Sequence, residues 1–594
     1  MRSKYFAAAV ILAMGLASFG RTLNLGFIWD DHQMIEENPH IKTLSADNIA
    51  HWFKSDPFNQ DLNYYRPLVS MSNAVDFSLW KLNPAGYHAT TLFFHLANSM
   101  LLFFLALQLG FSRTAALTAA ALFAASPVPV EQMIITAGRA ELMSLTFALL
   151  SISMFLRGGA FRYGLSMVFF AASLLAKENG IVTPLLFSLC LLLRKEKLRK
   201  HAGVIPFLSL IPLYLFIRQA AVGPALPEAG TWAVLKLSAL KIPKITAYYI
   251  FNSILPLDLH SHRLQPSFGW DAWIYGAVFV AASAAVIYRR DLIAFFCGGW
   301  YLLNLAPKIP LLATNDLMLD HWVYPSCFGL FLAAGYWGER YASGRPAGPV
   351  THRRKFLTYQ AVGRWRKTSA LACAAAALAF YVFEANRNIT MRGSDMKIYE
   401  HAARRTTSAP MRYNLAREYM LSGKPEKALA YFKLVSAKYP ENEIYSNGLA
   451  MALAAAGKTK DAERILDDML KGTHPLPQTF YNRAVLFEKS GRNDKAEAVL
   501  HKCAGLFPDY ADAGLFLSRI FLEKNEKGKA RKELEALLVT DPFNAEALVN
   551  LGTLEAESGN FARAGFLWKK AVAVQPGNTA ALDNLKKLRT LGYY

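Results

Sequence analysis

The stretch from Ala89 to Gly110 reads ATTLFFHLANSMLLFFLALQLG and contains no Asp, Glu, Lys or Arg. A helix needs roughly 20 mostly apolar residues to cross the hydrocarbon core of a bilayer, and this stretch has that length. Apolar runs of this kind recur up to about residue 385, after which the chain becomes rich in Ala, Glu and Lys. The sequence therefore predicts an all-α fold, with a polytopic membrane part followed by a soluble helical part.

About eleven apolar runs are candidate membrane spans. They cover residues 5–25, 89–110, 113–129, 139–156, 161–177, 180–194, 203–218, 272–288, 292–307, 321–338 and 369–385. A further stretch, 245–257, is interrupted by Asn252 and Pro256, and we interpret it as a re-entrant or surface-lying helix. If it does not cross, Arg289-Arg290 and the basic segment between residues 339 and 367 share a side with the N-terminus and with the basic cluster near residue 194, as the positive-inside tendency requires. The C-terminal part is then expected on the outer face.

The formal net charge of +21 does not require a nucleic-acid partner. Much of the excess lies in short stretches between apolar runs, where basic residues orient membrane proteins. The five cysteines show neither a disulfide framework nor the spacing of a zinc site. We therefore expect the lipid bilayer as a partner and no nucleic acid.

A 34-residue repeat fills the C-terminal part of the chain. The turn residues of successive repeats are Gly423, Gly457, Gly491, Asn525 and Gly559. An Ala follows each of them five residues later, where a small side chain lets two helices pack closely. This period and pattern are typical of tetratricopeptide repeats. We therefore divide the chain into a membrane domain, 1–390, and a tetratricopeptide α-solenoid, 391–594, with about five repeats and a closing helix.

Two adjacent carboxylates, Asp30 and Asp31, follow the first apolar run directly after Trp29. An acidic pair at the point where a helix leaves the bilayer is costly unless it has a role. We predict that Asp30 or Asp31 is a catalytic base that takes a proton from an acceptor hydroxyl. The alternative interpretation is that both are ordinary solvated residues at a helix end.

Cations recur on the predicted outer side, where topology does not call for them. A phosphate leaving group in a low-dielectric site needs fixed cationic partners, which these residues can supply. The candidate donor phosphate- or sugar-binding residues are Arg66, His88, Arg139, Lys177, Glu178, Arg218 and His321. Structural alternatives stay open: Arg66, Arg139 and Lys177 can be snorkelling anchors, His88 can be an interior hydrogen-bonding residue, and Lys177 with Glu178 can form a local ion pair.

Short motifs on the outer side follow one another in a fixed order. They are Trp29-Asp30-Asp31, Glu37-Asn38-Pro39, Tyr65-Arg66-Pro67-Leu68, Tyr87-His88, His95-Leu96-Ala97-Asn98, Gly138-Arg139-Ala140-Glu141-Leu142, Ala176-Lys177-Glu178 and Tyr324-Pro325-Ser326. Their ordered combination, with repeats after the membrane part, resembles the TMTC proteins. Those are membrane and tetratricopeptide O-mannosyltransferases of the GT-C glycosyltransferase class.

The resemblance implies an inverting glycosyltransferase that uses a polyprenyl-phosphate-linked sugar on the non-cytosolic face. It implies that Asp30 or Asp31 is the base, that the acceptor is a hydroxyl, expected to belong to protein Ser or Thr, and that the repeat groove binds the acceptor protein or peptide. The chain departs from the pattern at His321, where a Glu-Arg pair is expected, and at Pro127-Val128-Pro129, which lacks an expected His. A compact chain of this kind favours a bacterial inner-membrane protein with its repeats in the periplasm.

Two other functions stay open from the sequence. One is a GT-C transferase that modifies a glycolipid, and the other is a non-enzymatic membrane anchor that displays the repeats as an assembly scaffold. No cofactor is certain; the acidic pair can hold a divalent cation, but it supplies too few ligands to identify one. The sugar, the acceptor and the number of spans are not fixed by the sequence.

Overall fold

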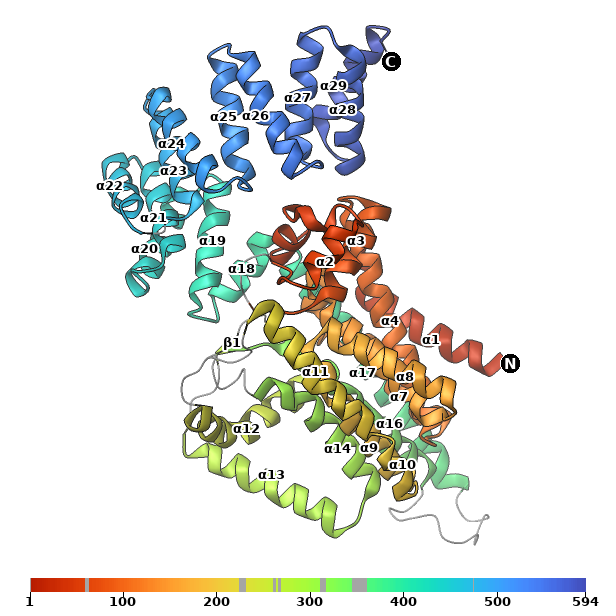
Figure 1. The fold of residues 1–594 in the computed structure, drawn as a ribbon. Helices are drawn as coiled ribbons and strands as arrows, with labels where there is room; N and C mark the ends of the chain where they lie inside the picture. The colour runs from red at the N-terminus through yellow and green to blue at the C-terminus, as the bar shows by residue number, and fades with distance from the viewer. Residues whose placement is uncertain are drawn as a thin grey trace. The chain divides into compact units, whose positions relative to one another are not determined.

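A computed structural model describes residues 2–58, 63–223, 231–259, 263–264, 269–309, 317–344, 360–473 and 475–593. The chain divides into two compact units, the first made of Met1–Asp76 with Pro84–Ser394, the second of Phe77–Asn83 with Asp395–Tyr594. Both units are helical (Figure 1). Within the described ranges the only strands are β1 (Arg263–Leu264) and β2 (Leu317–Met318), which pair antiparallel. The all-α prediction is confirmed, with this two-residue pairing as the one exception described.

The helices up to residue 392 include long apolar helices and short turns that connect them. The long ones are α1 (Arg2–Phe19), α3 (Pro67–Trp80), α4 (Pro84–Gln108), α5 (Arg113–Ala125), α7 (Ala140–Arg157), α8 (Ala160–Ala176), α9 (Thr183–Leu193), α11 (Ile205–Val222), α12 (Thr231–Ile254), α13 (Asp271–Tyr288), α14 (Leu292–Leu305), α16 (Cys327–Ser343) and α17 (Gln360–Arg392). The short ones are η1 (Gly20–Asn24), η2 (His32–Glu36), η3 (Pro39–Ile41), α2 (Ala46–Trp52), α6 (Val130–Ile134), η4 (Thr136–Arg139), η5 (Glu178–Val182), α10 (Leu198–Ala202), η6 (Ala306–Lys308) and η7 (Asp320–Val323).

Each of the eleven predicted spans coincides with one of these helices. By length and composition, six helices in the described ranges are long and apolar enough to cross a membrane: Tyr5–Asn24, Pro84–Gln108, Thr136–Arg157, Lys200–Val222, Asp271–Tyr288 and Trp365–Arg392. The count of eleven crossings stays a prediction. Helix α12 begins at Thr231, before the expected start at residue 245. The segment before residue 245 contains Lys236, Lys241 and Lys244, so it does not stand out as an apolar run in the sequence.

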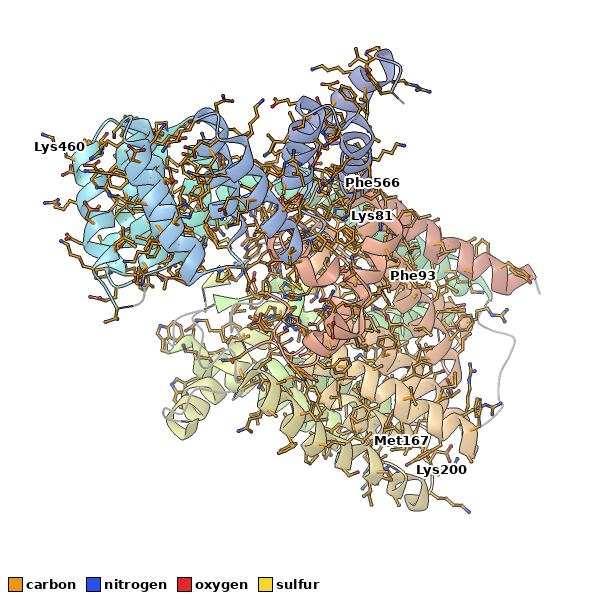
Figure 2. The ribbon with its side chains drawn as sticks, turned by 45° about the horizontal axis from the view of Figure 1, so that its top comes forward. Lys81, Phe93, Met167, Lys200, Lys460 and Phe566 are labelled. Carbon is orange, nitrogen blue, oxygen red and sulfur yellow. The ribbon has the colours of Figure 1, made fainter. Side chains whose placement is uncertain are left out.

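Large apolar side chains project outward from several of these helices. Phe93 on α4 is 64% exposed and is labelled in Figure 2, and Phe216 on α11 is 73% exposed. On α13, Trp273 and Val278 are 65% and 63% exposed. Large apolar side chains exposed on several helices indicate contact with another apolar phase, and on helices of this length a lipid bilayer fits that requirement.

Helices α7 and α8 pack closely through serines. Ser151 and Ser166 each donate to the other's backbone carbonyl, at 2.7 and 2.8 Å, and Ser144 and Ser173 do the same at 3.1 and 2.8 Å. Small polar residues let membrane helices approach each other and hydrogen-bond across the interface. The antiparallel pair turns at two glycines with positive φ, Gly158 (69°) and Gly159 (89°).

In the residues that the structure describes, the second unit has a first helix, α18, then the repeats as five helical pairs, and a closing helix. Figure 1 shows these helices side by side along the unit. Its helices are α18 (Asp395–Ala403), α19 (Ala409–Leu421), α20 (Pro425–Lys438), α21 (Glu443–Ala455), α22 (Thr459–Leu470), α23 (Pro477–Lys489), α24 (Asn493–Leu506), α25 (Ala511–Glu523), α26 (Lys527–Thr540), α27 (Ala545–Glu557), α28 (Phe561–Val574) and α29 (Thr579–Thr590). All five turn residues have positive φ, including Asn525 at 58°, and all five alanines are completely buried, as the repeat pattern requires.

Gly180 in η5 determines how closely η5 approaches α8. A Cβ atom at Gly180 would lie 2.7 Å from the Ser173 hydroxyl oxygen and 2.9 Å from the Leu174 backbone nitrogen. We expect Gly180→Ala to lower the free energy of unfolding by about 1–3 kcal/mol, because α8 backbone has to move. Gly164→Ala on α8 is the control, since a Cβ there meets nothing within 4 Å. Thermal unfolding of the two variants in detergent measures this effect. Equal unfolding midpoints for Gly180→Ala and Gly164→Ala would contradict the close approach of η5 to α8.

Candidate active site

The first outer loop reverses direction at Trp29. After η1 the backbone is extended at Leu25 and has no regular secondary structure up to Ile28. Trp29 then adopts φ of 55°, a left-handed conformation that is unfavourable for a bulky side chain. Asp30 and Asp31 follow at once and lead into η2, which is a single turn of π-helix. Asp31 is completely buried, whereas Asp30 is partly exposed. The turn therefore places two neighbouring carboxylates in different surroundings.

Asp31 is an anchor for this loop. Its Oδ2 accepts hydrogen bonds from the backbone N–H groups of Ile28 (3.2 Å) and Thr136 (3.1 Å). Its Oδ1 accepts hydrogen bonds from the Thr136 hydroxyl (3.0 Å) and the Ala137 N–H (2.6 Å). Burial raises the pKa of Asp31 to about 6, although the hydrogen bonds from Ala137, Thr136 and Ile28 oppose that rise. With both oxygens occupied, Asp31 ties the loop to η4.

Asp30 is the accessible carboxylate of the pair. It makes no hydrogen bond or ion pair to any residue in the described part of the chain. Its pKa is raised to about 7, first by burial and then by the negative charges of Asp31 and Glu131, while the charge of Arg66 lowers it. Glu131 in turn faces His321, whose Nδ1 lies 3.1 Å from Glu131 Oε1. A carboxylate with this pKa is a stronger base than a solvated Asp.

Three cations gather around two glutamates next to this loop. Lys177 Nζ lies 2.5 Å and Lys308 Nζ lies 3.5 Å from the same oxygen, Oε2 of Glu141. The other oxygen of Glu141 accepts a hydrogen bond from the Asn179 side chain. Glu141 and Lys308 are 1% exposed and Lys177 is 8% exposed, so this part of the cluster is almost closed to solvent.

Arg66 adds the third cation. Its Nη2 lies 3.4 Å from Oε1 of Glu178, and its guanidinium carbon lies 4.5 Å from the centre of the Tyr64 ring. Arg66 is 16% and Glu178 is 38% exposed, so this end of the cluster is the more open one. Since η5 carries Glu178 beside Lys177, the two ion pairs form one continuous group.

Three further residues predicted to bind the donor make contacts that join elements of the fold, and their binding role stays a prediction. Arg139 is completely buried and donates to Asp76, the Ser72 hydroxyl (3.0 Å) and the carbonyl oxygens of Thr136 (3.1 Å) and Tyr87 (3.2 Å). These contacts join α3, η4 and α4.

Arg218 and His88 likewise contact backbone carbonyl oxygens. Arg218 donates to the carbonyl oxygens of Asn63 (2.6 Å) and Gly223 (2.9 Å). The two ring nitrogens of His88 lie 3.2 Å from the carbonyl oxygens of Gly26 and Met133, so His88 bridges the first outer loop and α6. The contacts of His88 fit the interior hydrogen-bonding alternative, and the binding roles of Arg218 and His88 stay predictions.

The sequence motifs thus bring Asp30, Arg66, Lys177 and Glu178 together, with His321 reaching the group through Glu131. Glu131, Glu141 and Lys308 are further members that no motif distinguished as binding residues. Glu141 lies in the Gly138–Leu142 motif, but Lys308 is a single cation after an apolar run, and its partner is 167 residues away. Among the residues that the structure describes, no three His, Cys, Asp or Glu side chains gather as a metal site.

Comparisons with known proteins point to one kind of relative. A family model for the tetratricopeptide repeat matches residues 419–475 and 488–552. The chain is 22% identical over 607 residues to the Homo sapiens protein O-mannosyl-transferase TMTC3, covering 92% of this chain and 66% of that protein. It is 31% identical over 188 residues to the Drosophila melanogaster protein O-mannosyl-transferase Tmtc1, covering 30% of this chain and 22% of that protein.

The chain spans from about a fifth to about two thirds of the length of these relatives. Among solved structures, a thermophilic TPR protein of Thermus thermophilus is 16% identical with a TM-score of 0.27, covering 31% of this chain and 100% of that chain. By these curated relatives and the family model, the chain is similar to the TMTC proteins and contains tetratricopeptide repeats, as the sequence motifs predict.

The raised pKa of Asp30 predicts a pH dependence of stability. Because the pKa is about 7 in the folded protein and 3.8 as the ordinary value, the folded state binds more protons, and stability falls as the pH rises from about 4 to 7. We expect the decrease in the free energy of unfolding between these pH values to be smaller in Asp30→Asn, by at most a few kcal/mol. Thermal unfolding at pH 5 and pH 8 measures it, with Asp47→Asn, an exposed residue of α2, as the control. An unchanged fall in Asp30→Asn would contradict the raised pKa.

Proposed function

We propose that this protein is a membrane glycosyltransferase that moves a sugar from a polyprenyl-phosphate-linked donor to a protein Ser or Thr hydroxyl, with inversion. The observation that carries the proposal is the position of Asp30. It is a carboxylate without hydrogen-bond partners among the described residues, and it lies within electrostatic range of Arg66, where the cation cluster begins. The names of the relatives support mannose as the sugar and protein as the acceptor.

The charge of the cluster supports a donor that carries one phosphate. With Lys308 protonated, Arg66, Lys177 and Lys308 contribute three positive charges, and Glu141 and Glu178 contribute two negative charges. The surplus is a single positive charge in a site that is largely closed to water. A sugar linked to a lipid through one phosphodiester carries one negative charge, which this surplus neutralises. Fixed cations also stabilise the charge that develops on the leaving phosphate.

Asp30 is the base in this scheme. Its carboxylate accepts the proton of the acceptor hydroxyl while the hydroxyl oxygen forms a bond to the anomeric carbon. The bond from that carbon to the phosphate oxygen breaks on the opposite face, and the polyprenyl phosphate leaves with the electron pair. Attack opposite the leaving group inverts the anomeric centre. Asp31 touches no substrate here, because its four hydrogen bonds use both oxygens to hold the loop.

The repeats supply the acceptor side of the proposal. Tetratricopeptide units stack into extended surfaces that bind polypeptide segments. We assign the repeat groove to the acceptor protein or peptide, and the glycolipid acceptor becomes an outcome of the experiment below. The site and the repeats both belong to the outer, periplasmic side of a bacterial inner membrane in this scheme.

The role of Asp30 predicts a large loss of activity in Asp30→Asn. We expect transfer to fall by about 10²–10⁴-fold, because the amide keeps the size of the side chain but cannot accept a proton. The assay follows sugar from polyprenyl-phosphate mannose into acceptor protein in membranes, with Asp47→Asn as the matched control. Intact-mass comparison of proteins and lipids from cells with wild type or Asp30→Asn identifies the acceptor. Normal sugar transfer by Asp30→Asn would contradict the assignment of Asp30 as the base. Sugar found only on lipid would mean that the acceptor is a lipid and not a protein.

The proposed topology predicts which positions a membrane-impermeant maleimide reaches. Glu37 lies in the first outer loop and Lys460 lies on α22, and both are exposed; Figure 2 labels Lys460 and Lys200. We expect Glu37→Cys and Lys460→Cys to be labelled from the periplasmic side in intact spheroplasts. Lys200→Cys, in a predicted cytoplasmic loop, should react only after the membrane is permeabilised. Protection of Glu37→Cys together with labelling of Lys200→Cys would reverse the topology.

A further inference from the structure

Lys308 is the most deeply buried cation of the cluster, and the proposed function does not give it a role of its own. It ends η6, directly after α14, and is 1% exposed. Its Nζ lies 3.5 Å from Glu141 Oε2 and 5.8 Å from the centre of the Trp322 ring. With this exposure it does not offer its charge to a ligand from outside, so its effect has to pass through its neighbours.

The neighbour that Lys308 shares with the rest of the cluster is Glu141. Lys177 contacts the same carboxylate oxygen at 2.5 Å. If Glu141 had Lys177 as its only cation, the two charges would cancel. Lys308 supplies a second positive charge at the same oxygen, and Lys177, which is more exposed, then keeps a net attraction for an anion. A buried carboxylate that lies between two cations holds both cations at short range.

We propose that Lys308 is a positioning residue that keeps the donor-phosphate site positive by offsetting the charge of Glu141, so that Lys177 and Arg66 face the phosphate. This inference rests on the proposed function and deepens it. Lys308 itself does not touch the donor. Its loss removes one unit of charge from the cluster and leaves as many carboxylates as cations, which removes the surplus that a singly charged phosphodiester neutralises.

The groups around Lys308 make this effect dependent on pH. Burial lowers the pKa of Lys308 to about 7, Glu141 on α7 and Glu178 on η5 raise it, and Lys177 and Arg66 lower it. From η7, the Trp322 ring faces Lys308, and His321 acts on Glu141. Helix α14 contributes no Asp, Glu, Lys, Arg or His. As the pH rises through about 7, Lys308 loses its proton and the cluster loses its surplus charge.

The experiment measures the donor KM and kcat of the full-length protein in detergent or nanodiscs at pH 6 and pH 8, with polyprenyl-phosphate mannose as the probe. For wild type we expect the donor KM to rise about tenfold between the two pH values, the order expected for loss of one unit charge in a partly buried site. Lys308→Arg keeps a permanent charge, so its donor KM should be low at both pH values. Lys308→Met should have the high donor KM at both pH values.

The donor KM separates this role from that of Asp30. Protonation of Asp30 lowers kcat at low pH in all variants, whereas Lys308 acts on the donor KM at high pH. A wild-type donor KM that does not depend on pH would overturn the role of Lys308 and leave the proposed function intact. An equal pH dependence in Lys308→Arg would overturn it as well, and this variant keeps the test valid if Lys308→Met does not fold. Absence of any sugar transfer by wild type would overturn both.

Discussion

The four hydrogen bonds to Asp31 are the constraint on which the site depends. A buried carboxylate is tolerated when donors satisfy its oxygens, and here the donors come from Ile28 on one side and from Thr136 and Ala137 on the other. They fasten the first outer loop to η4 and hold Trp29 in a left-handed conformation that is unfavourable for a bulky side chain. His88 reinforces the same junction by bridging the carbonyl oxygens of Gly26 and Met133.

The second constraint is the alternation of charge from Arg66 to Lys308. Each glutamate of the cluster contacts a cation from another element, so the ion pairs join the segment before α3 to η5, and α7 to both the end of α8 and η6. Glu141, Lys177 and Lys308 are almost completely buried, and such charges are stable only with close opposite partners, so removal of one partner leaves another charge uncompensated. The cluster therefore holds its short helical turns in place and, in the proposed function, presents them to an anion.

The sequence predicts the fold well because apolar length and repeat period are local properties. Every predicted span became a helix, and the turn residues and alanines of the repeats adopt the expected φ and burial. The site is predicted only in part, since a motif shows a cation but not its partner. Arg139 and Lys177 look alike in sequence, yet Arg139 is paired with Asp76, which lies 63 residues away, whereas Lys177 shares Glu141 with a second cation, Lys308. Lys308 has no motif at all, and only its contact with Glu141 reveals it.

The structure also explains why the sequence did not distinguish the roles of Asp30 and Asp31. Both have the same chemistry, and a single left-handed residue gives one of them four donors and the other none among the described residues. The two remain coupled, because after burial the charge of Asp31 is the first charge that raises the pKa of Asp30. The anchor that fixes the loop therefore also increases the basicity of its neighbour. An uncharged anchor at position 31 could supply hydrogen-bond acceptors, but it would leave Asp30 a weaker base.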